Sequence, residues 1–139
     1  MTPATTAMRE YAIAKTGALL NSAAEAIEHA SHTPDEDAVH KMRVSIRRLQ
    51  QAIRLFKQYL EEDGVTHVKH RLRAIMEVAG ELRNRDIAMA LVTKAGGDDT
   101  ELAAQRLAYQ KQLETVLKRY AKTHLAQAWR EKLGLESAA

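Results

Sequence analysis

An apolar seam with helical spacing constrains the fold of this chain more than any other feature. Its members recur in steps of three and four residues, at Val39, Met42, Ile46, Leu49, Ile53, Phe56 and Leu60. A second seam follows with similar spacing, at Val68, Leu72, Ile75, Ala79, Leu82 and Met89. Such spacing puts the members of each seam on one face of an α-helix, and that face must be buried against other elements. No segment alternates with a period of two, so we predict an all-α protein.

Glycine and proline divide the chain into four predicted helices. The expected ranges are about 6–30, 33–62, 65–94 and 98–133. Asp63-Gly64 separates the second helix from the third, Gly96-Gly97 ends the third, and Gly134 ends the fourth. Because short connections make neighbouring long helices antiparallel, we predict an antiparallel four-helix bundle.

The second helix carries a start signal of three residues, Thr33, Pro34 and Glu36. Thr33 suits the N-cap, Pro34 suits the first helical position, and Glu36 completes a capping box. We therefore expect this helix to begin with Thr33 as its cap and to reach about Glu62.

Length and composition limit the classes of protein to consider. A chain of 139 residues is long enough for one domain, which we assign to residues 1–139, and too short for two. The chain has no cysteine, which excludes disulfides and thiolate chemistry and suits a reducing compartment. No apolar run is long enough to span a bilayer, and the N-terminal residues lack a secretory signal. We expect a cytoplasmic protein with no membrane partner.

A row of cationic and polar side chains lies one residue beyond the first seam. Residues 40–60 hold six Lys or Arg and no Asp or Glu, although the whole chain has 21 basic and 18 acidic residues. An exposed helix face normally mixes Glu with Lys for a few tenths of a kcal/mol per pair, whereas a run of guanidinium groups suits phosphate oxygens. A solvated face that covers the edge of the core is the competing interpretation. The row is about 25 Å long and consists of His40, Arg43, Arg47, Gln50, Arg54 and Lys57, with Arg48 on a neighbouring flank.

The third predicted helix repeats this arrangement. One residue beyond its seam lie Lys69, Arg73, Met76, Gly80 and Arg83. A glycine inside a helix costs about 1 kcal/mol relative to alanine, and close packing between helices is a better explanation for Gly80 than the approach of an anion. Two antiparallel helices with such rows would form a cationic groove for an anion. Asp86 falls in the seam register, where a carboxylate needs a partner or water, and we expect it to orient an arginine, with Arg83 and Arg85 near it in the sequence.

Two motifs in these helices resemble those of the CHAD family (conserved histidine α-helical domain). The segment HKMRVSIRRLQQAIRLF has the family's His, its Arg-Val three residues later and its Arg-Arg-Leu, at His40, Arg43-Val44 and Arg47-Arg48-Leu49. The segment LRAIMEVAGELRNRDI is similar to the second motif of the family, with Ala79 in place of its Leu and Asn84 in place of its Asp. The resemblance covers about residues 33–92.

The resemblance implies a helical bundle that binds inorganic polyphosphate through basic side chains in a groove, and that is not itself an enzyme. A cytoplasmic location near polyphosphate granules follows from that expectation. The family domain usually contains two four-helix units, whereas this chain has the length of one. Either a homodimer supplies the second half, or one open groove binds more weakly. The ligands implied by position are His40, Arg43, Arg47, Arg48, Lys69, Arg73 and Arg83, whereas Arg54 and Lys57 rest on helical spacing alone.

Other chemistry has little support in the sequence. His67 and His70 are spaced i,i+3 but have no evident third ligand, so we predict no metal site and no cofactor. No nucleophile lies in a recognisable motif, which argues against an enzyme. Nucleic acid is the main alternative partner because the same arginines would bind its phosphates, although neither basic row contains a stacking aromatic residue. A protein-interaction module that docks an acidic partner remains a third interpretation.

Overall fold

The all-α class is confirmed by a computed structural model, which describes residues 3–121 and 124–135. Its elements are α1 (Pro3–His32), α2 (Glu36–Phe56), a short 3-10 helix η1 (Lys57–Tyr59), α3 (Glu62–Lys94), α4 (Thr100–Ala121) and α5 (Leu125–Leu133). Within the described ranges there is no β-strand.

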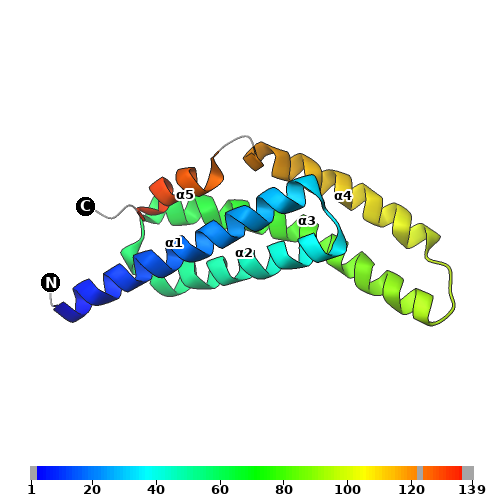
Figure 1. Cartoon of the computed structure of the whole chain (residues 1–139), viewed down its shortest axis with the longest axis horizontal. Helices are drawn as coiled ribbons and strands as arrows, with labels where there is room; N and C mark the ends of the chain where they lie inside the picture. Colours follow the sequence, from blue (N-terminus) through cyan, green and yellow to red (C-terminus); the bar gives the residue numbers. More distant parts are fainter. Residues whose placement is uncertain (1–2, 122–123, 136–139) are drawn as a thin grey trace.

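The helices form two hairpins that lie against each other (Figure 1). In the first hairpin α2 returns along α1, and in the second α4 returns along α3. The far end of the α3–α4 hairpin extends beyond the turn that joins α1 to α2, and α5 lies over the beginning of α3. The expected fourth helix over 98–133 is therefore two helices, α4 and α5, and residues 122 and 123 between them lie outside the described part.

Helix α2 begins later than the capping box suggested. Its N-cap is Asp35, whose carboxylate accepts a hydrogen bond from the Ala38 backbone N–H at 2.8 Å. Thr33 instead donates its backbone N–H to the His29 carbonyl at 3.0 Å and so closes the end of α1. The prediction of a Thr33 cap was wrong because Asp35 caps the same helix two residues further along, and a carboxylate is also favoured there by the helix dipole.

The break between α2 and α3 also differs from the expectation. Helix α2 ends at Phe56, and α3 already begins at Glu62, so Asp63 and Gly64 lie in its first turn. Gly64 is buried, and a Cβ atom on it would lie 1.7 Å from the Lys132 carbonyl oxygen. This glycine therefore permits close packing of the α5 backbone on α3 and does not stop a helix.

The other two glycine signals are confirmed. Gly96, which follows α3, has a φ of 76°, and Gly134, the C-cap of α5, has a φ of 70°. Both lie in the left-handed region that glycine adopts at little cost, which is the usual way for a helix to end.

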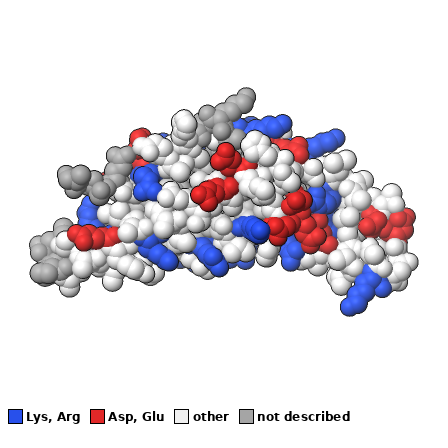
Figure 2. Space-filling model, viewed as in Figure 1, with Lys and Arg blue, Asp and Glu red and all other residues white. Residues whose placement is uncertain are grey.

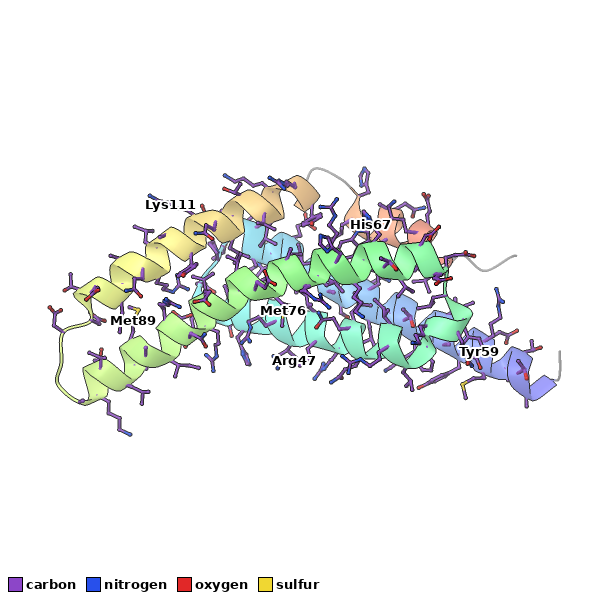
Figure 3. All side chains as sticks on the ribbon, turned by 180° about the vertical axis from the view of Figure 1, so that it is seen from behind. Arg47, Tyr59, His67, Met76, Met89 and Lys111 are labelled. Atoms are coloured by element: carbon purple, nitrogen blue, oxygen red, sulfur yellow. The ribbon has the colours of Figure 1, made fainter. Side chains whose placement is uncertain are left out.

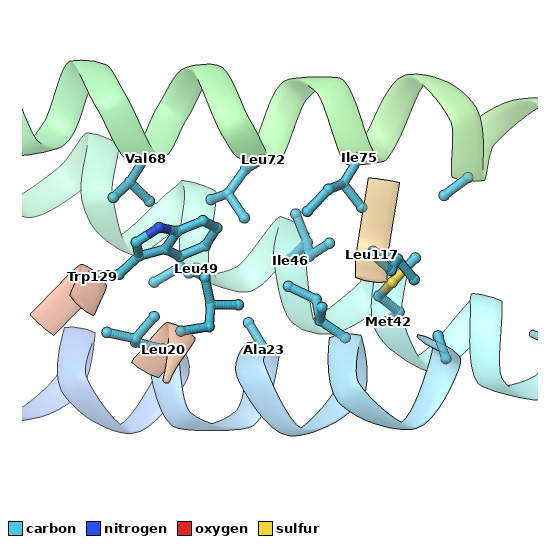
Figure 4. Close-up of a cluster of buried hydrophobic side chains, with 14 of the residues drawn as sticks. Leu20, Ala23, Met42, Ile46, Leu49, Val68, Leu72, Ile75, Leu117 and Trp129 are labelled. Atoms are coloured by element: carbon cyan, nitrogen blue, oxygen red, sulfur yellow. The ribbon is translucent and has the colours of Figure 1, made fainter. Parts of the chain in front are cut away.

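The two apolar seams form most of the hydrophobic core (Figure 4). Met42, Ile46 and Leu49 of α2 and Leu72 and Ile75 of α3 are fully buried. The other helices contribute Leu20, Ala23, Leu117 and Trp129 to the same cluster. Because every seam residue from Val68 to Leu82 is buried, while Met89 on the extended hairpin is only half-buried, the core fixes which flanks of α2 and α3 remain open to solvent.

Candidate anion-binding site

A pocket of about 300 Å³ lies between the C-terminal half of α2 and the N-terminal half of α3. Half of its lining residues are cationic and none is acidic. From α2 and η1 come Gln50, Ile53, Arg54 and Lys57, and from α3 come Val65, Lys69, Leu72 and Arg73. The apolar members, Ile53, Val65 and Leu72, belong to the edge of the core. The four cationic side chains therefore surround an apolar patch.

Helical geometry explains why these cations meet. Each basic row lies one residue, or about 100°, beyond the buried seam of its helix. The antiparallel arrangement of α2 and α3 then brings the end of one row beside the beginning of the other. Lys57 remains in the α2 row because the chain stays helical after Phe56, as the three-residue 3-10 helix η1.

A second group of cations lies nearer to the beginning of α2. Arg43 is half-buried, and its Nε atom is buried with no hydrogen-bond partner in the described part of the chain. Burial lowers the pKa of the Arg43 guanidinium, and the charges of Arg47 on α2 and Arg83 on α3 lower this pKa further. Arg47 and Arg83 are thus each close enough to Arg43 to repel its charge, and the three residues come from both helices.

Arg83 is the member of the two rows that has an acidic partner among the described residues. Its Nη1 atom lies 3.5 Å from a carboxylate oxygen of Glu36, in the first turn of α2. The two side chains are 31% and 64% exposed, and a pair so open to water contributes at most about 1 kcal/mol. Glu36 therefore marks the acidic end of the row without neutralising Arg43 or Arg47.

His40 and Arg48 lie apart from the α2–α3 pocket. Both line a shallow hollow of about 520 Å³ between α1 and α2, together with Lys41 of α2 and Glu25 and His29 of α1. Arg48 follows Arg47 by one residue, and this rotation of about 100° carries it away from α3. The predicted ligands thus fall into three groups: the four around the pocket, the three arginines, and this pair.

Figures 2 and 3 show opposite sides of the molecule. Figure 2 shows Lys and Arg side chains spaced along the edge of the molecule that α2 forms, with acidic side chains gathered toward the junction of α1 and α2. Figure 3 shows the opposite side, where Arg47 on α2 and Met76 on α3 lie at about the same level along their helices. Lys111 on α4 points away from both.

Asp86 is paired with an arginine that the sequence did not single out. Its Oδ1 atom accepts a hydrogen bond from Nε of Arg106 on α4 at 2.5 Å. Arg106 also donates to the Pro34 carbonyl at 3.3 Å and to Gln110 at 2.7 Å, and so ties α3 and α4 to the α1–α2 connection. This network lies about 20 Å further along α3 than Arg73 of the pocket.

The nearby Arg85 is also held by the protein. It pairs with Glu81, donates to Gln105 at 3.2 Å, and lies 4.6 Å over the Tyr109 ring. Neither Arg83 nor Arg85 is thus the partner of Asp86. A contact between residues twenty positions apart on two helices leaves no local signal in the sequence.

Gly80 does not have the close contact that was expected of it. A Cβ atom built on this residue would meet no atom within 4 Å, and the residue is half-exposed. The interpretation of Gly80 as a site of close helix packing was therefore wrong.

Within the described ranges, no three His, Asp or Glu side chains are grouped so that they could hold a metal ion. Over the same residues, no helix is both long enough and apolar enough to cross a membrane.

Comparisons with known proteins identify the family of this all-helical chain. The family model of the CHAD domain matches residues 16–139, nearly the whole chain. The chain therefore belongs to the CHAD family. No curated protein matches it. One solved structure, described as the periplasmic sensor domain of a sensor histidine kinase, aligns at 17% identity over 97% of this chain and 94% of its own, with a TM-score of 0.35.

Proposed function

We propose that this chain binds inorganic polyphosphate, without catalysing a reaction, through a basic groove between α2 and α3. The observation that carries the proposal is the pocket lined by Arg54, Lys57, Lys69 and Arg73 with no acidic residue. Placing like charges around one hollow costs electrostatic free energy, and a bound polyanion would convert that repulsion into attraction. Membership of the CHAD family supports the same ligand class.

A linear ligand would use the pocket and the arginine group together. From Arg43 to Lys57 the row measures about 21 Å along the helix axis. A small anion would fill one end only, whereas a chain of phosphates would reach both. Guanidinium groups bind phosphate oxygens in a bidentate way, and Arg43, Arg47 and Arg83 would supply such groups to one end of the chain.

We include His40 and Arg48 in the proposed site because of the family motif, not because of a position in the pocket. The family motif assigns them to the ligand, whereas they line the hollow between α1 and α2. We include them as outer contacts for a chain that leaves the groove around α2. Single replacements of either residue by alanine should therefore weaken binding less than replacement of Arg43 or Arg73.

The proposal also treats the helices as one half of a CHAD domain, an antiparallel four-helix unit in which α4 and α5 together supply the fourth rod. A homodimer would then supply the other half. Ile87, Leu91 and Leu107 near the tip of the α3–α4 hairpin are 44%, 63% and 50% exposed, which leaves apolar area for such a contact. A mass measurement in solution, with and without polyphosphate, decides between one unit and two.

The test of function is a competition between polyanions. Labelled long-chain polyphosphate would be bound first and then displaced by unlabelled polyphosphate, single-stranded DNA or double-stranded DNA, matched for phosphate count at one salt concentration. We expect polyphosphate to compete best. Equal competition by all three would indicate a general polyanion surface, and absence of polyphosphate binding would favour a module that docks an acidic protein. Salt dependence alone does not discriminate, because counterion release makes it steep for every polyanion.

A further inference from the structure

Neither the backbone conformation nor the packing in the described part of the chain explains why residue 80, Gly80, is a glycine. It lies in the middle of α3, and its φ is not positive, since Gly96 and Gly134 are the described residues with positive φ. Beyond its own turn of the helix, no described atom lies within 4 Å of the place where a Cβ would stand. A glycine inside a helix lowers stability relative to alanine, yet neither backbone strain nor packing requires one here.

At two other positions of the same chain, close contact with a neighbouring helix explains the glycine. At Gly64 a Cβ would collide with the Lys132 carbonyl, and at Gly17 it would lie 3.1 Å from the Arg130 guanidinium. Both residues are buried beneath a neighbouring helix. Gly80 differs from them because the space in front of it is open.

That open space borders the arginine group. On a helix, residues three and four positions apart share a face, so Met76 and Arg83 flank Gly80 on α3. Arg83 in turn is close enough to Arg43 on α2 to lower its pKa. Gly80 therefore lies on the face of α3 that carries its basic row, between Arg83, one turn further along, and Met76, which is level with Arg47 of α2.

We propose that Gly80 is a ligand-contact position, where the polyanion lies directly against the backbone of α3. Without a side chain at this position, a phosphate group can reach far enough into the groove to meet Arg43, Arg47 and Arg83 together. A methyl group would hold the phosphate out by about its own radius, and charge-assisted hydrogen bonds weaken over such a displacement. This inference rests on the proposed polyphosphate function and names one determinant of it.

The experiment separates stability from binding by using Gly80→Ala and Gly80→Leu. Both replacements should raise the Tm, by about 4 °C for alanine, because alanine and leucine favour the helix and the added atoms meet nothing. Both should weaken polyphosphate binding, and Gly80→Leu should weaken it by at least about tenfold, the equivalent of one charge-assisted hydrogen bond. Ala74→Leu is the matched control, since Ala74 is exposed on α3 about 120° around the helix from Gly80. It should bind as the wild type does.

Each outcome decides the proposal. A higher Tm with progressively weaker binding supports it. Wild-type affinity in Gly80→Leu, while Arg43→Glu still abolishes binding, would overturn the role of Gly80 and leave the groove in place. A lower Tm in Gly80→Ala would show that the position is not open and would overturn the inference as well. A wild-type chain that binds no polyphosphate would overturn both this inference and the proposed function.

Discussion

The two sides of α3 differ in whether nearby cationic residues are paired with acidic ones. On the side toward α4, Arg85 pairs with Glu81 and lies over Tyr109, and Asp86 pairs with Arg106. On the side toward α2, Arg83 makes an exposed pair with Glu36, whereas Lys69 and Arg73 share a pocket with Arg54 and Lys57 and, among the described residues, have no ion pair with an acid.

The difference separates structural cations from available ones. A cation paired within the protein is neutralised there, and its hydrogen bonds hold two elements together. A group of cations without internal counterions raises the free energy of the folded chain and leaves its field for an external anion. The first kind should therefore govern stability and the second kind should govern binding, which can be tested residue by residue.

Removal of the buried pair on the α4 side should have the largest effect. Asp86 is 7% exposed and Arg106 is 16% exposed, so Arg106→Leu leaves a buried carboxylate without a partner. We expect the free energy of unfolding to fall by about 3 kcal/mol, measured by urea denaturation, with unchanged polyphosphate affinity of the folded protein.

The double variant Asp86→Leu with Arg106→Leu is the control for this prediction. It removes both charges, so most of the lost stability should return. A single variant as stable as the wild type would contradict the assignment of this pair to structure.

Neutralisation of the pocket should have the opposite signature. Arg54→Gln and Arg73→Gln each remove one unpaired charge, so each should weaken polyphosphate binding by roughly tenfold while changing stability by less than about 0.5 kcal/mol. Binding would be measured by isothermal titration and stability by denaturation of the same samples. A loss of stability without a loss of affinity would place these residues among the structural cations.

A single replacement of Arg43 should raise stability and weaken polyphosphate binding at the same time. Because burial and two neighbouring arginines disfavour its charge, Arg43→Met should keep the packing of the stem and raise the free energy of unfolding by up to about 1 kcal/mol. The same variant should bind polyphosphate less tightly. Lys111→Met is the matched control, because Lys111 is exposed on α4 and points away from α2 and α3. A destabilised Arg43→Met would contradict this account of Arg43.

The smallest effect concerns His67, which faces neither the pocket nor the α4 pairs. Burial lowers the pKa of His67, and the charges of Lys132, Arg71 and His70 lower it further. Between this lowered pKa and the ordinary value near 6.5, the unfolded chain binds more protons than the folded one, so stability rises with pH across that window.

His67→Gln should remove this part of the pH dependence, a fraction of 1 kcal/mol, in unfolding curves measured from pH 5 to pH 8. Added polyphosphate should leave the titration of His67 unchanged, followed by NMR. A large shift would mean that the ligand also reaches the α5 side of α3.

Much of the fold was predictable because local patterns determine it. The seams of α2 and α3 identified the core helices, and Gly96 and Gly134 identified two helix ends, since both signals depend only on neighbouring residues. The cap of α2 was misplaced because Thr33 and Asp35 are both good capping residues, and the choice depends on how α1 ends. The break between α4 and α5 was missed because no proline or glycine marks it.

The part of the site that depends on the angular position of residues around each helix was predictable from the sequence. One-residue offsets from the seams predicted a row on each helix, and five of those residues, four of them cationic, line one pocket. The phase alone did not show that Arg48 rotates away toward α1, that Arg106 on another helix pairs with Asp86, or that the space before Gly80 is open. These features depend on which helix lies beside which, and that is set by the packing of the whole chain.

The most direct test of the central claim is a charge reversal on each side of the molecule. Arg43→Glu with Arg47→Glu alters the unpaired arginines, and Lys111→Glu with Lys118→Glu makes the same change in net charge at exposed positions of α4. Polyphosphate titration of both double variants, with helicity checked by circular dichroism, should show binding abolished in the first and at most slightly weakened in the second. Equal loss in both, or unchanged binding in the first, would contradict a ligand site between α2 and α3.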